Sequence, residues 1–157
     1  MEDWNKMLNF ALDLVLESKI SQAHTFIGER IIILHLDHAM ELLMKAFLIK
    51  KGYIIEEIDN KKIKKNGIKE DTDIKTLINK DKTIGYLDCL DLVSKIVNFR
   101  KKDKIVRFHR IRNEIQHRAT NLPLNKEEEI SNFYPYFKEL YGLMFPDFER
   151  TFPNITD

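Results

Sequence analysis

The residues of this sequence best suited to chemistry are Arg112, Asn113 and His117, which lie within six positions of one another. On an ideal helix Asn113 and His117 are one turn apart and project away from the apolar positions Ile111 and Ile115. A histidine exchanges protons near neutral pH, and an arginine stabilises negative charge on phosphoryl oxygens. A polar cluster opposite a core stripe has no packing role, so it is a candidate for chemistry. An ordinary solvated helix face is the alternative.

The elements that must position this cluster are predicted to be helices. Gly (5) and Pro (4) are scarce, and no stretch alternates apolar and polar residues as a strand does. Apolar residues recur instead at helical spacing. The sequence therefore predicts an all-α fold, a bundle of about five helices. The expected helices cover residues 4–18, 21–50, 86–99 and 104–120, and a last helix follows Asn125.

Capping residues predict where several of these helices begin and end. Ser21, Asp103 and Asn125 are the expected N-caps. Asn125 and Glu128, three residues apart, resemble a capping box. Gly52 is expected to end the second helix, because glycine readily adopts the backbone conformation that follows a helix.

Two segments fall outside the helical pattern. Residues 53–82 are polar and weakly periodic, so we expect a connection that holds at most a short helix over residues 73–79. The tail from Pro146 onward is expected to pack irregularly. Neither segment divides the chain, and we predict a single domain over residues 1–157.

Composition and hydropathy limit the class of protein. The net charge is +1, with 43% hydrophobic and 32% charged residues, as in globular proteins. Cys89 is the single cysteine, which excludes an intrachain disulfide and a zinc site built from several cysteines. The acidic start does not resemble a signal peptide, and charged residues interrupt the most apolar stretch, residues 31–49. We therefore expect a cytoplasmic protein with no membrane span.

Positive charge is concentrated in residues 100–118, which contain eight basic and two acidic residues. A solvated helix face is the usual explanation for such a run. Here the run contains the Arg–Asn–His cluster, and this coincidence favours a surface that binds an anionic partner such as a nucleic acid.

The cluster resembles the hallmark of the HEPN superfamily, Arg-x(4–6)-His on a late helix, often with an asparagine directly after the arginine. In this chain the hallmark reads Arg112-Asn113-x-x-x-His117. Residues 38–46 also resemble the second helix of that family, with Glu41 and Lys45 one turn apart. The order of the predicted helices agrees, so the resemblance covers about residues 21–142.

The resemblance implies a metal-independent endoribonuclease of the kind found in toxin–antitoxin, CRISPR-linked and other phage-defence systems. In that chemistry the ribose 2′-hydroxyl attacks the adjacent phosphate, at a cleft where two domains bring their motifs together. It implies His117 as the acid–base residue, Arg112 as the cation and Asn113 as their polar support, with no cofactor or metal. The implied partners are RNA, a second copy of the chain in a homodimer, and an antitoxin or other regulatory protein.

Two arginines compete for the phosphate. Arg110 aligns with His117 on an ideal helical wheel, whereas Arg112 is rotated from His117 by about 140°, toward the edge of the core. The family motif selects Arg112, so we expect Arg112 to act with Arg110 in support.

Further residues are expected to have supporting roles. Glu41 and Lys45 form an i,i+4 pair that we expect to stabilise the fold rather than take part in chemistry. The expected RNA-binding residues are Arg107, His109, Arg110 and Arg118. For His109 the alternative is an ordinary surface position.

Two other functions remain open. The chain could be a non-catalytic HEPN-like module that binds RNA, a nucleotide or a protein. It could also be a purely structural helical dimer that uses the Arg–Asn–His cluster for hydrogen bonds at its interface. Cleavage of RNA without a metal ion would distinguish the ribonuclease from both alternatives. Binding of RNA without cleavage would distinguish the non-catalytic module from the structural dimer.

Overall fold

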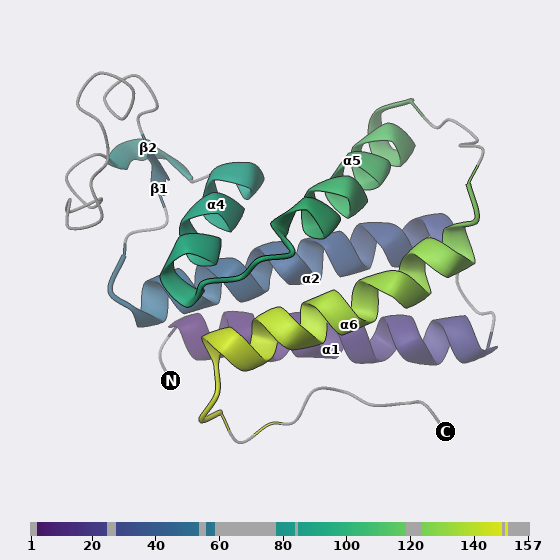
Figure 1. Ribbon diagram of the computed structural model, residues 1–157, viewed down its shortest axis with the longest axis horizontal. Helices are drawn as coiled ribbons and strands as arrows, with labels where there is room; N and C mark the ends of the chain where they lie inside the picture. Colours follow the sequence, from purple (N-terminus) through teal and green to yellow (C-terminus); the bar gives the residue numbers. More distant parts are fainter. Residues whose placement is uncertain are drawn as a thin grey trace.

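The chain folds into a bundle of helices, which confirms the all-α prediction (Figure 1). The computed structural model describes residues 3–24, 28–53, 56–58, 78–83, 85–118, 124–148 and 150. Within those residues there are five α-helices: α1 (Asp3–His24), α2 (Glu29–Lys50), α4 (Tyr86–Val97), α5 (Lys102–Arg118) and α6 (Lys126–Met144).

Helix α2 lies at the centre of the bundle and contacts each of the other four helices (Figure 1). Helix α1 runs antiparallel along it, α6 lies beside this pair, and α4 and α5 cover another side. A helix surrounded in this way must be apolar around most of its circumference. Its buried apolar positions are Ile32, Ile33, Leu36, Ala39, Met40, Leu43, Met44, Ala46, Phe47 and Leu48. Asp37 is the one charged residue among the buried positions of α2, and it is 1% exposed.

Two expected helix starts were wrong. Helix α1 continues to His24, and Ser21 lies inside it as a buried side chain, while Gly28 stands at the N-cap of α2. A serine is small enough to be buried where two helices pack closely. Helix α5 begins at Lys102, so Asp103 lies in its first turn, where a carboxylate complements the positive end of the helix dipole.

Two expected helix-terminating or helix-capping residues were confirmed. Gly52 follows α2 with a φ of 87°, a backbone conformation that favours glycine. At the start of α6 the side-chain oxygen of Asn125 accepts a hydrogen bond from the backbone N–H of Glu128, at 3.1 Å. This bond pairs one of the backbone donors that the first turn of a helix leaves free.

A pair of short strands interrupts the segment expected to be a polar connection. Strands β1 (Glu56–Ile58) and β2 (Ile78–Thr83) pair antiparallel, on the side of the bundle where α4 lies (Figure 1). The short helix expected over residues 73–79 is wrong at residues 78 and 79, and its remainder lies outside the described residues. The residues of β2 do not alternate between apolar and polar, so the usual sequence signal of a strand is missing.

Residues 145–148 and 150 form no helix or strand, as predicted for the C-terminal tail, and the rest of the tail lies outside the described residues. Phe145 is buried and stacks on Trp4, and Phe148 contacts the same ring edge-on. A guanidinium nitrogen of Arg150 lies 2.7 Å from a carboxylate oxygen of Asp13 on α1. The start of the tail therefore closes over α1. Of the helices described, none is both long and apolar enough to cross a bilayer.

Candidate functional site

Helix α5 carries the predicted site, and its apolar face is buried as expected. Ile105, Phe108, Ile111 and Ile115 are at most 6% exposed, and the ring of Phe108 stacks on Phe133 of α6 at 3.9 Å between centroids. These contacts fix the rotation of α5 about its axis. They therefore determine which of its polar side chains turn toward α2 and which turn toward solvent.

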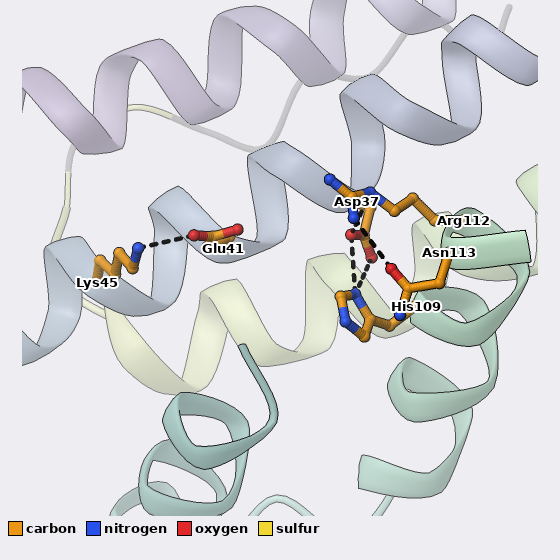
Figure 2. A network of polar contacts seen from close by, with 6 residues as sticks. All are labelled: Asp37, Glu41, Lys45, His109, Arg112 and Asn113. Atoms are coloured by element: carbon orange, nitrogen blue, oxygen red, sulfur yellow. Dashed lines mark hydrogen bonds and ion pairs between the residues drawn. The ribbon is translucent and has the colours of Figure 1, made fainter. Parts of the chain in front are cut away.

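Asp37 of α2 is the centre of a polar cluster between α2 and α5 (Figure 2). Its carboxylate oxygens lie 2.9 and 3.2 Å from Nδ1 of His109, and Oδ2 lies 3.4 Å from Nε of Arg112. The side chain of Asp37 is only 2% exposed. A buried carboxylate is costly unless charged and hydrogen-bonding partners surround it, and His109 and Arg112 supply both.

Arg112 is held at two points. Besides its ion pair with Asp37, its Nη1 donates a hydrogen bond to Oδ1 of Asn113, at 3.0 Å. The guanidinium has five N–H groups, and Nη1 is the nitrogen that donates a hydrogen bond among the described residues. With 26% of its side chain exposed, Arg112 is a fixed cation that keeps N–H donors for another anion.

Tyr86, the first residue of α4, completes the cluster from a third helix. Its ring stacks on the imidazole of His109, with 3.8 Å between centroids and 6° between planes. Burial, and then the negative charge of Asp37, raise the pKa of Tyr86 well above its usual value. The phenol therefore stays neutral and provides a flat wall that limits how the imidazole can rotate.

Glu41 and Lys45 form the expected pair further along α2 (Figure 2). Nζ of Lys45 lies 2.7 Å from Oε1 of Glu41, and the two side chains are 12% and 31% exposed, respectively. Both charges act on the buried thiol of Cys89 in α4, so the pair lies beside α4. This position agrees with a structural role, and Glu41 also lies near enough to act on Tyr86 of the Asp37 cluster.

The other predicted residues of α5 are more exposed than the cluster or face another helix. His117 and Arg110 are exposed, in contrast to the half-buried Arg112 and Asn113. Arg107 faces α6, where its Nη2 lies 2.6 Å from Oε1 of Glu129, so it is apart from the cluster. Arg118 ends α5, and its side chain lies outside the described residues.

The structure shows where His109 and the two competing arginines lie. The plain-surface alternative for His109 is wrong, because its side chain is 12% exposed and bound to Asp37. Its expected role in RNA binding stays a prediction. Between the arginines, Arg112 is the one bound into the cluster, while Arg110 points to solvent. The reason is the rotation of α5, which places residues 109, 112 and 113 against α2.

Sequence reasoning missed Asp37 and Tyr86 as members of the site. One signal for Asp37 was available: it stands at helical spacing between Ile33 and Met40, both fully buried, where an unpaired charge would be costly. Tyr86 gave no comparable signal, because an aromatic residue at the start of an apolar helix is usually core.

Among the described residues, no group of three or more His, Cys, Asp or Glu side chains is placed to hold a metal ion. No family model, no curated protein and no solved structure matches this chain. The resemblance to the HEPN superfamily therefore depends on the residues of the chain alone.

Proposed function

We propose that this protein is a HEPN-type endoribonuclease that cleaves RNA without a metal ion, in the cytoplasm, as a toxin or phage-defence effector. The observation that carries the proposal is the state of Arg112, which is fixed by Asp37 and Asn113 and still has free N–H donors. His117 lies on the same helix, one turn beyond Asn113, and is exposed.

In the proposed reaction the ribose 2′-oxygen forms a bond to the adjacent phosphorus, and the bond from phosphorus to the 5′-oxygen breaks. The leaving 5′-oxygen keeps the electron pair and takes up a proton, while the 2′-hydroxyl loses one. His117 takes part in this proton transfer, and Arg112 stabilises the charge that builds on the phosphoryl oxygens. The products carry 2′,3′-cyclic phosphate and 5′-hydroxyl ends, and DNA is inert because it has no 2′-hydroxyl.

We further propose that the active unit is a homodimer in which the two α5 helices line one groove. A single copy offers an exposed basic helix face, and a second copy related by two-fold symmetry would enclose the substrate between two such faces. Light scattering at micromolar concentration should give twice the monomer mass. A strict monomer would contradict this part of the proposal.

The decisive experiment compares cleavage of RNA by the wild type and by His117→Ala. We expect a loss of about two to four orders of magnitude in rate, with an unchanged circular dichroism spectrum, because His117 is exposed. His38→Ala, an exposed histidine on α2, is the matched control and should cleave normally. EDTA should have no effect. A cleavage reaction that requires a divalent ion, or full activity in His117→Ala, would overturn the proposal.

One observation favours the alternative of a non-catalytic module. The ion pair of Arg112 with the buried Asp37 is itself a reason for an arginine at this position. If the protein retains RNA in a filter-binding assay and never cleaves it, with varied substrates, the alternative is the better description. If the protein also fails to bind RNA, the structural helical dimer is the better description, with the cluster used for hydrogen bonds at its interface.

A further inference from the structure

The Asp37–His109 pair has a geometry that favours proton transfer. Asp37 engages Nδ1 of the imidazole at 2.9 Å, so in the neutral ring the proton sits on Nδ1 and Nε2 carries the lone pair. A buried carboxylate in this position also stabilises the imidazolium that forms when Nε2 takes a proton. Nε2 has no hydrogen-bond partner among the described residues.

His109, Asn113 and His117 form one stripe along α5, at positions i, i+4 and i+8. Each step advances about 6 Å along the helix and drifts by about 40° around it. Asn113 is the middle residue, and its side chain is bonded to Arg112. A phosphate held at Arg112 and Asn113 would therefore have one histidine a turn before it and another a turn after it.

From this arrangement we propose that the site uses two histidines, with His109 as the general base and His117 as the general acid, and with Asp37 as the residue that positions His109. The proposal depends on the proposed ribonuclease function and assigns the two proton transfers of that reaction. Nε2 of His109 accepts the proton of the 2′-hydroxyl as the 2′-oxygen bonds to phosphorus. Protonated His117 gives its proton to the departing 5′-oxygen, and both histidines then exchange protons with water.

The burial of the cluster supports this assignment. A small helical bundle gains nothing in packing from a carboxylate, an imidazole and a guanidinium between two helices, because apolar side chains of similar volume would serve as well or better. The stacked ring of Tyr86 adds a further restraint on the imidazole, as a proton-transfer group requires.

The two roles can be separated with a substrate whose leaving group needs no proton. Two oligonucleotides are made around a mapped cleavage position, each with a single ribonucleotide, and with either oxygen or sulfur at the 5′ position of the scissile bond. Because a thiolate leaves without protonation, the sulfur linkage should restore His117→Ala to near the wild-type rate. His109→Ala should be slow on both linkages, by about two to four orders of magnitude.

The outcomes distinguish this proposal from the one it depends on. A wild type that cleaves neither linkage contradicts the ribonuclease function, and the assignment falls with it. A wild type that cleaves, together with an unaffected His109→Ala or with sulfur rescue of His109→Ala, contradicts the assignment alone. Arg30→Ala, an exposed substitution on α2, is the control and should be unchanged on both substrates.

Two measurements cover the possibility that His109→Ala does not fold. His109→Phe keeps a ring to stack on Tyr86 and removes the proton acceptor, so it should fold and be slow on both linkages. In the wild type, nitrogen NMR of the His109 ring should show the Nδ1–H tautomer when the ring is neutral. The opposite tautomer, or fast cleavage by a folded His109→Phe, would overturn the assignment.

Discussion

Nδ1 of His109 lies 2.9 Å from Oδ2 of Asp37, although 72 positions separate the two residues in the chain. The contact joins α5 to α2, the central helix of the bundle. It places a carboxylate, an imidazole and the guanidinium of Arg112 where a helical bundle normally has aliphatic side chains. Both the stability of the protein and the chemistry of its site should therefore depend on this contact.

Asp37→Ala should lower the free energy of unfolding by roughly 3 kcal/mol, because it leaves Nδ1 of His109 without its hydrogen-bond acceptor and Arg112 without its buried counter-charge. Urea denaturation measures the change. Asp91→Ala is the matched control, since Asp91 is 53% exposed and pairs with Lys102 on the surface; it should cost less than about 1 kcal/mol. Equal effects of the two substitutions would show that Asp37 is not a buried ionic partner.

Lys45→Ala should lower the free energy of unfolding by about 1–2 kcal/mol and leave RNA cleavage per folded molecule unchanged. The side chain of Lys45 is 12% exposed, so the substitution removes packed methylene groups as well as the pair with Glu41. Lys101→Ala, which breaks an exposed pair with Glu139, is the stability control. Lost cleavage with unchanged stability would contradict the structural role of Lys45.

The raised pKa of Tyr86 predicts a loss of stability at alkaline pH. In the unfolded chain this phenol ionises at a pKa near 10.0, while burial and Asp37 keep it neutral in the folded protein. The unfolded state therefore binds fewer protons above pH 10, and the free energy of unfolding falls by about 1.4 kcal/mol per pH unit for this group.

Denaturation of Tyr86→Phe over the same pH range tests this account. The substitution removes the ionising group, so its stability should fall less steeply than that of the wild type above pH 10. Below pH 9 the two pH dependences should be parallel, because the phenol is neutral in both states. Identical slopes at alkaline pH would contradict the assigned environment of Tyr86.

Cys89 should be unreactive as long as the protein is folded. The residue is fully buried, and burial raises the pKa of its thiol to about 12, so almost no thiolate forms near neutral pH. A thiol reagent should label it only at the rate at which the bundle opens, and labelling should be complete in urea. Rapid labelling of the native protein would contradict the buried position.

Sequence patterns predicted the parts of the fold that depend on local spacing. Ile111 and Ile115 are buried as the helical wheel indicates, and Asn125 caps α6. The expected cap at Ser21 failed because a serine can cap a helix or be buried within one, and the sequence around it does not distinguish the two. Which outcome occurs depends on how closely α1 and α2 pack, and that is a tertiary property.

The site could be predicted only as far as one helix extends. The stripe of Asn113 and His117 follows from spacing along α5, whereas the bond between His109 and Asp37 depends on the rotation of α5 against α2. That rotation is fixed by the packing of Phe108 against Phe133 of α6, a contact between two helices that spacing along α5 does not reveal. For the same reason the wheel alone favoured Arg110 over Arg112.

The central position of α2 has a consequence for how this protein opens. Because α2 touches every other described helix, its backbone amides cannot reach water unless several helices separate at once. Hydrogen exchange at residues 36–44 should therefore proceed only through global unfolding, while the first turns of α1 and α4 exchange through smaller local openings. Asp37 belongs to that slowest-exchanging segment, so a substitution that loosens the cluster should speed exchange throughout the bundle rather than only around His109.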